Sequence, residues 1–248
     1  MWFKYLLANP FVNIYPFRHG TVINCLYLRS ILIKKMKGRL FLFDLDGVII
    51  DTEGQYSLFW NEIGERYKGD REFAIKIKGQ TLSQIFAGNF PDMPELCKEL
   101  VKKIDLLERN LSYDYIPGVM EFIEDVKMAG IPSAIVTSSN REKMKSLYLV
   151  RPELKSLFDR IYTGEDFARS KPAPDCYLNA MREFGVAAER TVIFEDSPNG
   201  LKAACDSGGN VVGVATTFPR DEIAPFCSIV IDNFKEVTVE RLCKELPK

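Results

Sequence analysis

Short apolar runs alternate with helical periodicity through the second half of the chain. Strands are expected at residues 133–136, 161–162, 192–194, 211–214 and 229–231. Between and after them, apolar positions recur with helical spacing at 119–129, 141–149, from Pro174 to Gly185, 199–206 and 234–245. This alternation predicts parallel strands joined by right-handed crossovers. We therefore expect an α/β fold with an open, doubly wound, Rossmann-like parallel sheet.

One further apolar run precedes this alternation and ends in two acids. Leu40 to Phe43 has the pattern of a fully buried strand, and Asp44, Asp46 and Gly47 follow it. Side chains at i and i+2 of a strand lie on the same side, so the two carboxylates can converge. Two neighbouring carboxylates repel each other, and Mg²⁺ is the natural cation for an all-oxygen site. On these residues alone, a solvated strand end remains an alternative.

The segment between the first strand and residue 117 has helical spacing only. Thr52 is the expected N-cap of a first helix that ends at Gly69, and Pro94 opens the last helix. Two shorter helical elements are expected between them, and their apolar stripes are typical of a bundle core. We therefore expect an all-helical insert without strands, with the following boundaries: insert 52–116, core 36–51 and 117–248.

Residues 1–35 differ from the rest of the chain. No acid occurs before Asp44, aromatic residues are frequent, and Pro10 and Pro16 would interrupt a long helix. There is no apolar run of about 18 residues, so a membrane-spanning helix is not expected. A signal peptide does not fit either, because no small-residue cleavage site follows. We interpret residues 1–35 as an extension outside the fold.

Charge and rare residues narrow the classes of function. The formal net charge is −1, so no overall field attracts nucleic acid or an anionic membrane. The six cysteines contain no Cys-x-x-Cys pair, which indicates reduced thiols and a cytoplasmic protein. His19 is the single histidine, so a histidine-dependent catalytic triad in the core and a multi-histidine metal site are both excluded.

The predicted strand ends carry complementary chemistry. In open parallel sheets, ligands bind outside the carboxyl ends of the strands. Each residue there has a simpler interpretation: Ser138, Glu195 and Asp196 could cap helices, and Lys171 could be a surface lysine. Four such coincidences at successive strand ends favour one site that combines acids for a metal, hydroxyls for a phosphate and one fixed cation. Its residues are Asp44, Asp46, Thr137, Ser138, Ser139, Lys171, Glu195 and Asp196.

These motifs resemble those of the haloacid dehalogenase superfamily, and within it the phosphatases and phosphomutases related to β-phosphoglucomutase. The matching segments occur in the family's order and span roughly residues 38–232. They are specific for the family and say little about the substrate. The helical insert resembles the family's mobile cap. The matching segments are 44–48, 51–53, 136–140, 170–175 and 194–200.

The resemblance implies a role for each motif residue. Asp44 would be the nucleophile that forms an aspartyl-phosphate, and Asp46 would be the general acid and base. Mg²⁺ would be held by Asp44, the main-chain carbonyl of Asp46 and Asp196, with Glu195 in support. The transferring phosphoryl group would be bound by Ser138 and Lys171, with Thr137 and Ser139 in the same loop. The substrate contacts from the cap would be Lys78 and Gly79.

Two departures from the mutase pattern bear on the reaction. Tyr56 stands where the mutase has a histidine that helps control the acid/base, and Leu82 stands where it has an arginine that grips a second phosphate. Without that arginine, water is the more plausible acceptor of the phosphoryl group. We therefore expect a Mg²⁺-dependent phosphatase acting on a small phosphorylated metabolite, such as a sugar phosphate, in preference to a hexose-phosphate mutase.

Two other classes rank lower. Hydrolysis of a carbon–halogen bond needs neither a metal nor a second acid, so Asp46 argues against it. A non-catalytic binding module is disfavoured because every motif residue is present. The expected partner is a small-molecule phosphate ester, with no nucleic acid and no membrane, and the protein is expected to be a monomer.

Overall fold

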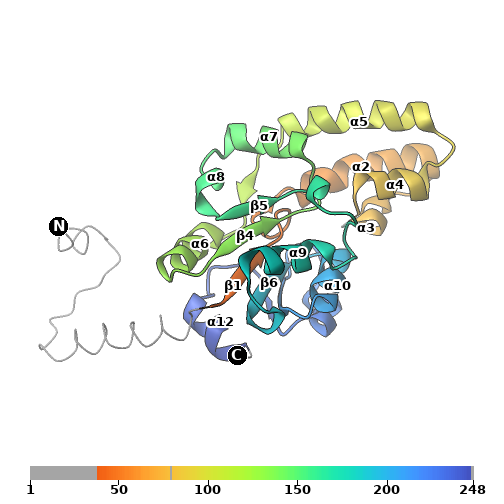
Figure 1. Ribbon diagram of the computed structural model, residues 1–248. Helices are drawn as coiled ribbons and strands as arrows, with labels where there is room; N and C mark the ends of the chain where they lie inside the picture. Colours follow the sequence, from red (N-terminus) through yellow and green to blue (C-terminus); the bar gives the residue numbers. More distant parts are fainter. Residues whose placement is uncertain (1–37, 79, 247–248) are drawn as a thin grey trace, which may run out of the picture. The chain divides into compact units, whose positions relative to one another are not determined.

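The structure, a computed structural model, describes residues 38–78 and 80–246. The chain divides after Met36 into two units, and everything below concerns the second. Its centre is a six-stranded parallel sheet with the order β5-β4-β1-β6-β7-β8 (Figure 1). The strands are β1 (Leu40–Phe43), β4 (Ser133–Val136), β5 (Arg160–Tyr162), β6 (Thr191–Glu195), β7 (Asn210–Val214) and β8 (Ile229–Ile231).

Strand β1 lies in the middle of the sheet and is fully buried. It pairs with β4, where Phe41 lies opposite Ser133, and with β6, where Phe43 lies opposite Phe194. A continuous apolar run is what a strand covered on both faces requires. The prediction of a doubly wound parallel α/β sheet is therefore confirmed.

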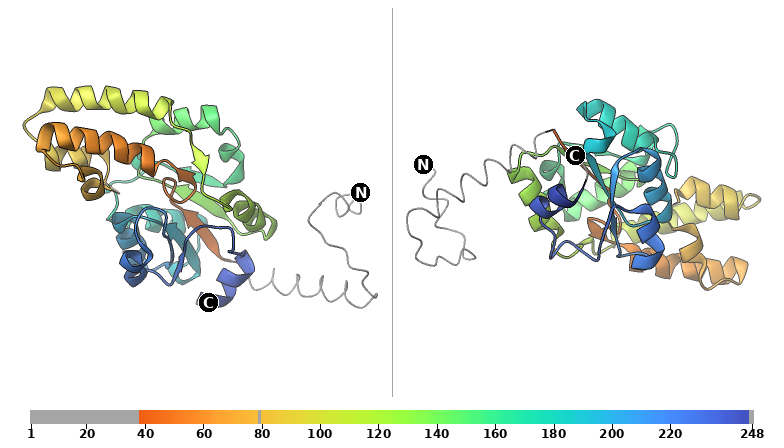
Figure 2. Two further views of the ribbon diagram at one scale, coloured as in Figure 1. Left: turned by 180° about the vertical axis from the view of Figure 1, so that it is seen from behind. Right: turned by 90° about the horizontal axis from the view of Figure 1, so that it is seen from below.

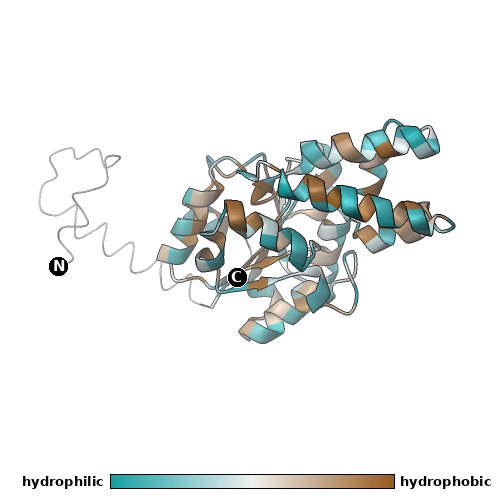
Figure 3. Cartoon of the chain, turned by 90° about the horizontal axis from the view of Figure 1, so that it is seen from above, coloured by the Kyte–Doolittle hydropathy of each residue, from teal (hydrophilic) through white to brown (hydrophobic). Residues whose placement is uncertain are grey.

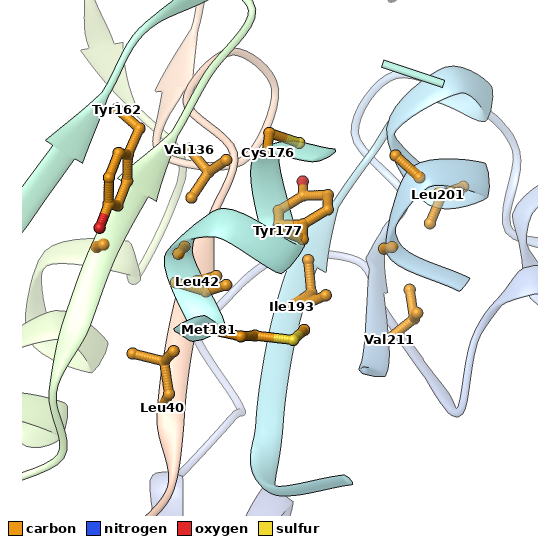
Figure 4. Close-up of a cluster of buried hydrophobic side chains, with 14 of the residues drawn as sticks. Leu40, Leu42, Val136, Tyr162, Cys176, Tyr177, Met181, Ile193, Leu201 and Val211 are labelled. Atoms are coloured by element: carbon orange, nitrogen blue, oxygen red, sulfur yellow. The ribbon is translucent and has the colours of Figure 1, made fainter. Parts of the chain in front are cut away.

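Alternate residues of β1 serve two separate layers of the core. Leu40 and Leu42 belong to a buried cluster that includes residues of α9 (Asp175–Phe184) and α10 (Pro198–Asp206), among them Tyr177 and Leu201 (Figure 4). On the opposite face, α6 (Val119–Met128) and α12 (Val239–Glu245) cover a cluster of phenylalanines. The ring centroids of Phe43 and Phe194 are 4.4 Å apart in this cluster. Aromatic pairs of this kind contribute about 0.5–1.5 kcal/mol beyond their buried area.

The remaining elements of the core are short or lie near its rim. Helix α7 (Arg141–Val150) follows β4, and α8 (Leu154–Leu157) and α11 (Arg220–Ile223) are single turns. Three 3₁₀ turns complete the core: η2 (Gly164–Asp166), η3 (Ala188–Arg190) and η4 (Ala224–Phe226). The single turns were not predicted, because four residues are too few to establish a helical period.

Four helices stand between β1 and α6, and we call them the helical insert. They are α2 (Glu53–Lys68), α3 (Phe73–Ile77), α4 (Leu82–Asn89) and α5 (Pro94–Arg109), which lie together to one side of the sheet (Figures 1 and 2). Apolar and polar positions alternate around them, as Figure 3 shows, and the apolar stripes meet around Trp60, Phe73 and Leu100. Gly69 ends α2 in a left-handed conformation with φ 66°.

The expectation that this segment contains no strand is wrong. Strands β2 (Ile50–Asp51) and β3 (Asp114–Tyr115) form a short antiparallel pair where the helical insert joins the core. Two residues are too few to show the alternation that identifies a strand. The side chain of Thr52 also does not cap α2, since its hydroxyl donates a hydrogen bond to Asp46 instead.

The described cysteines are free thiols: Cys97, Cys176, Cys205, Cys227 and Cys243. Cys25 lies outside the described residues, as does the 1–35 extension. Within the described part of the chain, every helix is too short or too polar to cross a bilayer.

Candidate active site

A cavity of about 440 Å³ lies between the carboxyl edge of the sheet and the helical insert. Its floor carries the side chains that follow the strands, among them Asp44, Asp46 and Lys171. Its roof comes from α2, α3, α4 and α5 and includes Tyr56, Ile77 and Leu82. The parallel register delivers the strand ends to one edge, which is why residues distant in sequence share this cavity.

Three carboxylates converge on the floor of the cavity. Asp44, Glu195 and Asp196 each offer an oxygen atom, and these atoms lie within 4.8 Å of one another. The pairing of β1 with β6 produces this arrangement, because the Asp44 N–H donates a hydrogen bond of 3.0 Å to the carbonyl of Phe194. All three carboxylates are buried.

A single buried lysine lies among these acids. The Lys171 ammonium is 2.7 Å from Asp44 Oδ1 and 2.6 Å from Glu195 Oε1, and it donates a further hydrogen bond of 3.0 Å to the carbonyl of Val136. Tyr177 of α9 donates a hydrogen bond of 2.6 Å to the same Glu195 oxygen. Sequence reasoning missed Tyr177, because its place in the apolar stripe of α9 makes it look like a core residue.

The acids outnumber the cation, and their pKa values reflect this. Burial raises the pKa of Asp44 to about 7, with Lys171 opposing the shift and Glu195 adding to it. Burial and the charges of Glu195, Glu53 and Asp44 raise the pKa of Asp196 well above its ordinary value. Buried carboxylates that repel one another and offer only oxygen donors fit a hard divalent cation.

Two glycines make room for the acids. A Cβ atom at Gly47 would lie 2.0 Å from Asp196 Oδ2, and one at Gly200 would lie 2.0 Å from Glu195 Oε1. Gly47 also has a left-handed φ of 75°. Side chains at these positions would displace the carboxylates, which explains physically why glycines follow Asp46 and Ser197 so closely.

The Asp46 carboxylate lies apart from the three-acid cluster and has its own donors. It accepts hydrogen bonds from Ser139 Oγ at 2.8 Å, from Lys143 Nζ at 2.6 Å, and from the hydroxyl of Thr52. Burial opposes ionisation of Asp46, but the charge of Lys143 and these hydrogen bonds lower its pKa overall. Lys143 was not predicted, since a lysine inside a helical pattern is indistinguishable from a solvated one.

The loop after β4 brings its hydroxyl groups to the cavity. Ser138 lines the cavity, and Thr137 Oγ1 accepts a hydrogen bond of 3.0 Å from the Ser139 N–H. Asn140, not Ser138, caps α7, and Ser197, not Glu195 or Asp196, caps α10. The helix-capping alternatives for these candidate residues are therefore excluded.

Lys78 and Gly79 are the two residues of the helical insert that are expected to contact the substrate, and the structure places only Lys78 in the cavity wall. Lys78 lines the cavity with a side chain that is 14% exposed, and its ammonium is 3.3 Å from Glu53 and 5.5 Å from the Phe218 ring centroid. Gly79 lies outside the described residues. The Gln84 amide donates a hydrogen bond of 3.2 Å to the carbonyl of Lys171, which ties α4 to the loop that carries this lysine.

Comparisons with known proteins agree with this geometry. The profile of the haloacid dehalogenase-like hydrolase family matches residues 41–214. A probable pseudouridine-5'-phosphatase of Saccharomyces cerevisiae is 31% identical over 192 residues, covering 70% of this chain and 80% of that protein. A phosphorylated carbohydrates phosphatase of Thermotoga maritima is 32% identical over 181 residues, covering 67% of this chain and 80% of that protein.

A solved structure gives the same result for the fold. The HAD hydrolase of family IA, variant 3, from Entamoeba histolytica superposes with a TM-score of 0.73 at 25% identity, covering 84% of this chain and 98% of that chain. The family profile spans both β1 and β7, and therefore the strand ends that carry the cavity floor. The resemblance first indicated by the motifs is confirmed: this chain belongs to the haloacid dehalogenase-like hydrolase family.

Proposed function

We propose that this protein is a Mg²⁺-dependent phosphatase that hydrolyses a small phosphorylated metabolite through an aspartyl-phosphate on Asp44. The observation that carries the proposal is the buried contact of Asp44 with Lys171 at 2.7 Å on the floor of a cavity of ligand size. A carboxylate beside a fixed cation can attack a phosphoryl group whose charge that cation helps to neutralise.

The chain's residues account for both halves of the reaction. An Asp44 oxygen forms a bond to phosphorus as the ester P–O bond breaks, and Asp46 gives a proton to the departing oxygen. Water then attacks the phosphoryl group, gives its proton to Asp46, and releases inorganic phosphate with Asp44 restored. The donors around Asp46 lower its pKa and keep it ionised, as it must be to accept a proton from water when the aspartyl-phosphate is hydrolysed. The approach of an anionic phosphate favours proton uptake by Asp46, as it needs for the earlier transfer to Asp44.

The acid cluster fits the metal that the family resemblance implies. Oxygens of Asp44 and Asp196 and the main-chain carbonyl of Asp46, supported by Glu195, would hold Mg²⁺. When bound, the ion supplies positive charge to the phosphoryl oxygens. Lys171 and the Ser138 loop then need only orient the transferring group.

The charges of the cavity wall favour a substrate with one phosphate. Each described lysine of the wall already has a carboxylate partner: Lys78 has Glu53, Lys143 has Asp46, and Lys171 has Asp44 and Glu195. The α5 side of the wall adds two more acids, Asp105 and Glu108. A second phosphate would meet repulsion there, which favours a phosphatase over a mutase that must hold a bisphosphate intermediate. The names of the two relatives, a probable pseudouridine-5'-phosphatase and a phosphorylated carbohydrates phosphatase, agree with a hydroxylated monoester.

A screen of phosphate esters tests the proposal. With Mg²⁺ present, we expect release of inorganic phosphate from several sugar and nucleoside monophosphates. We expect kcat/KM for glucose 6-phosphate to exceed that for glucose 1,6-bisphosphate by about tenfold or more, the scale of one unfavourable buried charge contact. Absence of release across the whole panel would overturn the phosphatase. Efficient conversion of glucose 1-phosphate to glucose 6-phosphate with a bisphosphate primer would favour the mutase.

Metal binding should depend on pH in a defined direction. The folded pKa of Asp44, about 7, lies above its ordinary value of 3.8, so its ionisation costs stability as pH rises through that interval. Protons and Mg²⁺ therefore compete for the cluster, and we expect Mg²⁺ to raise Tm more at pH 8 than at pH 5.5. Calorimetry with Mg²⁺ and with EDTA measures this, and activity lost in EDTA should return with excess Mg²⁺. A rise in Tm on adding Mg²⁺ that is equal at both pH values, or absent at both, would contradict the assignment.

A further inference from the structure

Lys143 occupies an unusual position between the core and the helical insert. It lies on α7 of the core, its side chain is 5% exposed, and its ammonium is 2.6 Å from Asp46 Oδ1. The same ammonium is 4.6 Å from the ring centroid of Tyr56, which belongs to α2 of the helical insert. One cation thus contacts the proposed acid/base on one side and the helical insert on the other.

The insert's side of this contact is itself held in place. The Tyr56 hydroxyl donates a hydrogen bond of 2.7 Å to Glu108 Oε1 on α5, and Glu108 is only 6% exposed. The Tyr113 hydroxyl donates a hydrogen bond of 2.7 Å to the Glu108 carbonyl. The charge of Lys143 lies close enough to Glu108 to oppose the effect of burial on its pKa. Helix α2 therefore presents a ring face to Lys143, and α5 fixes that ring through Glu108.

The three donors to Asp46 differ in how they are held. Thr52 and Ser139 have short side chains whose positions follow directly from the backbone beside β2 and after β4. Lys143 reaches Asp46 through a long, flexible side chain, which keeps one conformation only where its surroundings pack against it. Tyr56 provides that packing, with a cation–π contact that gains strength in a desolvated site.

We propose that Lys143 is a positioning residue that transmits the placement of the helical insert to the Asp46 carboxylate. With α5 packed on α7, Glu108 holds the Tyr56 ring, the ring holds the Lys143 ammonium, and the ammonium holds Asp46 in the orientation used for proton transfer. The inference rests on the proposed phosphatase function, in which Asp46 gives and takes the proton.

Lys145 provides a comparison within the same helix. It lies two residues further along α7, its side chain is 69% exposed, and it pairs with Glu142 in the solvent. Burying a lysine beside a tyrosine ring carries a desolvation cost that Lys145 avoids. The pair of lysines offers a matched test, because Lys→Met removes the same charge from the same helix in both places.

The leaving group reports on Asp46 directly. An alkyl monoester needs a proton on its departing oxygen, whereas p-nitrophenolate leaves as a stable anion. The value of kcat/KM reports the steps up to the departure of the leaving group, so it shows whether that proton is supplied. For Lys143→Met, we expect kcat/KM to fall by about 30-fold or more for glucose 6-phosphate, and by about threefold or less for p-nitrophenyl phosphate. Lys143→Arg, which keeps the charge, should recover activity on the alkyl ester to within about tenfold of the wild type. Lys145→Met should match the wild type on both esters.

A double-mutant cycle tests whether the helical insert acts through Lys143. Like Lys143→Met, Tyr56→Leu should lower kcat/KM for glucose 6-phosphate more than kcat/KM for p-nitrophenyl phosphate. Tyr56→Phe, which keeps the ring, should lower the ratio of the first value to the second by less. If the effect passes through Lys143, Tyr56→Leu combined with Lys143→Met should lose no more than Lys143→Met alone. Tm values for each variant identify any that fails to fold, in which case the Arg and Phe variants carry the comparison.

The outcomes separate this inference from the proposed function. A wild-type protein that releases no phosphate from p-nitrophenyl phosphate or from any ester of the panel would refute the phosphatase, and the inference with it. An active wild type whose Lys143→Met variant keeps the same ratio between the two esters would refute only the positioning role. Additive effects of Tyr56→Leu and Lys143→Met would refute the connection to the helical insert.

Discussion

Replacing Asp44 by Asn should reduce phosphate release at least about 10⁴-fold while leaving the fold intact, since an amide cannot act as the nucleophile. Asn has nearly the same size, so the contacts of β1 with β6 persist. The substitution also removes one of three mutually repelling acids, and Tm in the absence of metal should therefore stay level or rise. Steady-state phosphate release and thermal melting measure the two effects.

The matched control is Asp206→Asn. Asp206 ends α10, where it pairs with Lys202 at 2.7 Å and its side chain is 44% exposed. Asp206 is not among the residues that line the cavity, so this variant should keep full activity. A folded Asp44→Asn protein that retained turnover near the wild-type rate would remove the covalent mechanism from consideration.

Replacing Lys171 by Met should be the most destabilising substitution in the cavity. It leaves Asp44 and Glu195 buried without their shared cation, and removing one partner of a buried ion pair costs about 3–5 kcal/mol. Part of that loss should return with Mg²⁺, which supplies positive charge to the same acids. Urea denaturation with and without Mg²⁺ measures both quantities, and turnover should be lost because the phosphoryl oxygens lose their fixed cation.

Lys202→Met is the corresponding control on the surface. Lys202 pairs with Asp206 one turn along α10, and its side chain is 58% exposed. Solvent screens such pairs, so the urea midpoint should match that of the wild type. If Lys171→Met were equally stable, the ammonium of Lys171 would not be what balances the charge of the acid cluster.

Strand-end motifs made the core and the floor of the cavity predictable. Apolar runs too short for helices identified the strands, and Asp44, Ser138, Lys171 and Asp196 each follow such a run or lie on a neighbouring loop. Parallel strands end at the same edge, so the sequence order of these residues was enough to bring them together. The roles assigned to them stay predictions, to be tested by the experiments above.

Residues that act through a distant partner were not predictable. Lys143 and Glu108 lie in helices whose periodicity says only which face is apolar, and their places on either side of Tyr56 depend on how α5 packs on α7. The contact of Tyr177 with Glu195 was not predictable either, because Tyr177 lies in the apolar stripe of α9. Thr52 was read as a helix cap because its hydroxyl can serve either the local backbone or Asp46, and only the fold decides between them.

The central place of β1 also has a consequence for how the chain folds. This strand precedes the rest of the sheet in the chain, yet its neighbours are Ser133–Ile135 on one side and Thr191–Phe194 on the other. During synthesis, Leu40–Phe43 must wait as an unpaired apolar segment until Ile135 has left the ribosome, and its second edge stays open until Phe194 has followed. Pairings this distant in sequence slow folding and expose strand edges to aggregation in the meantime.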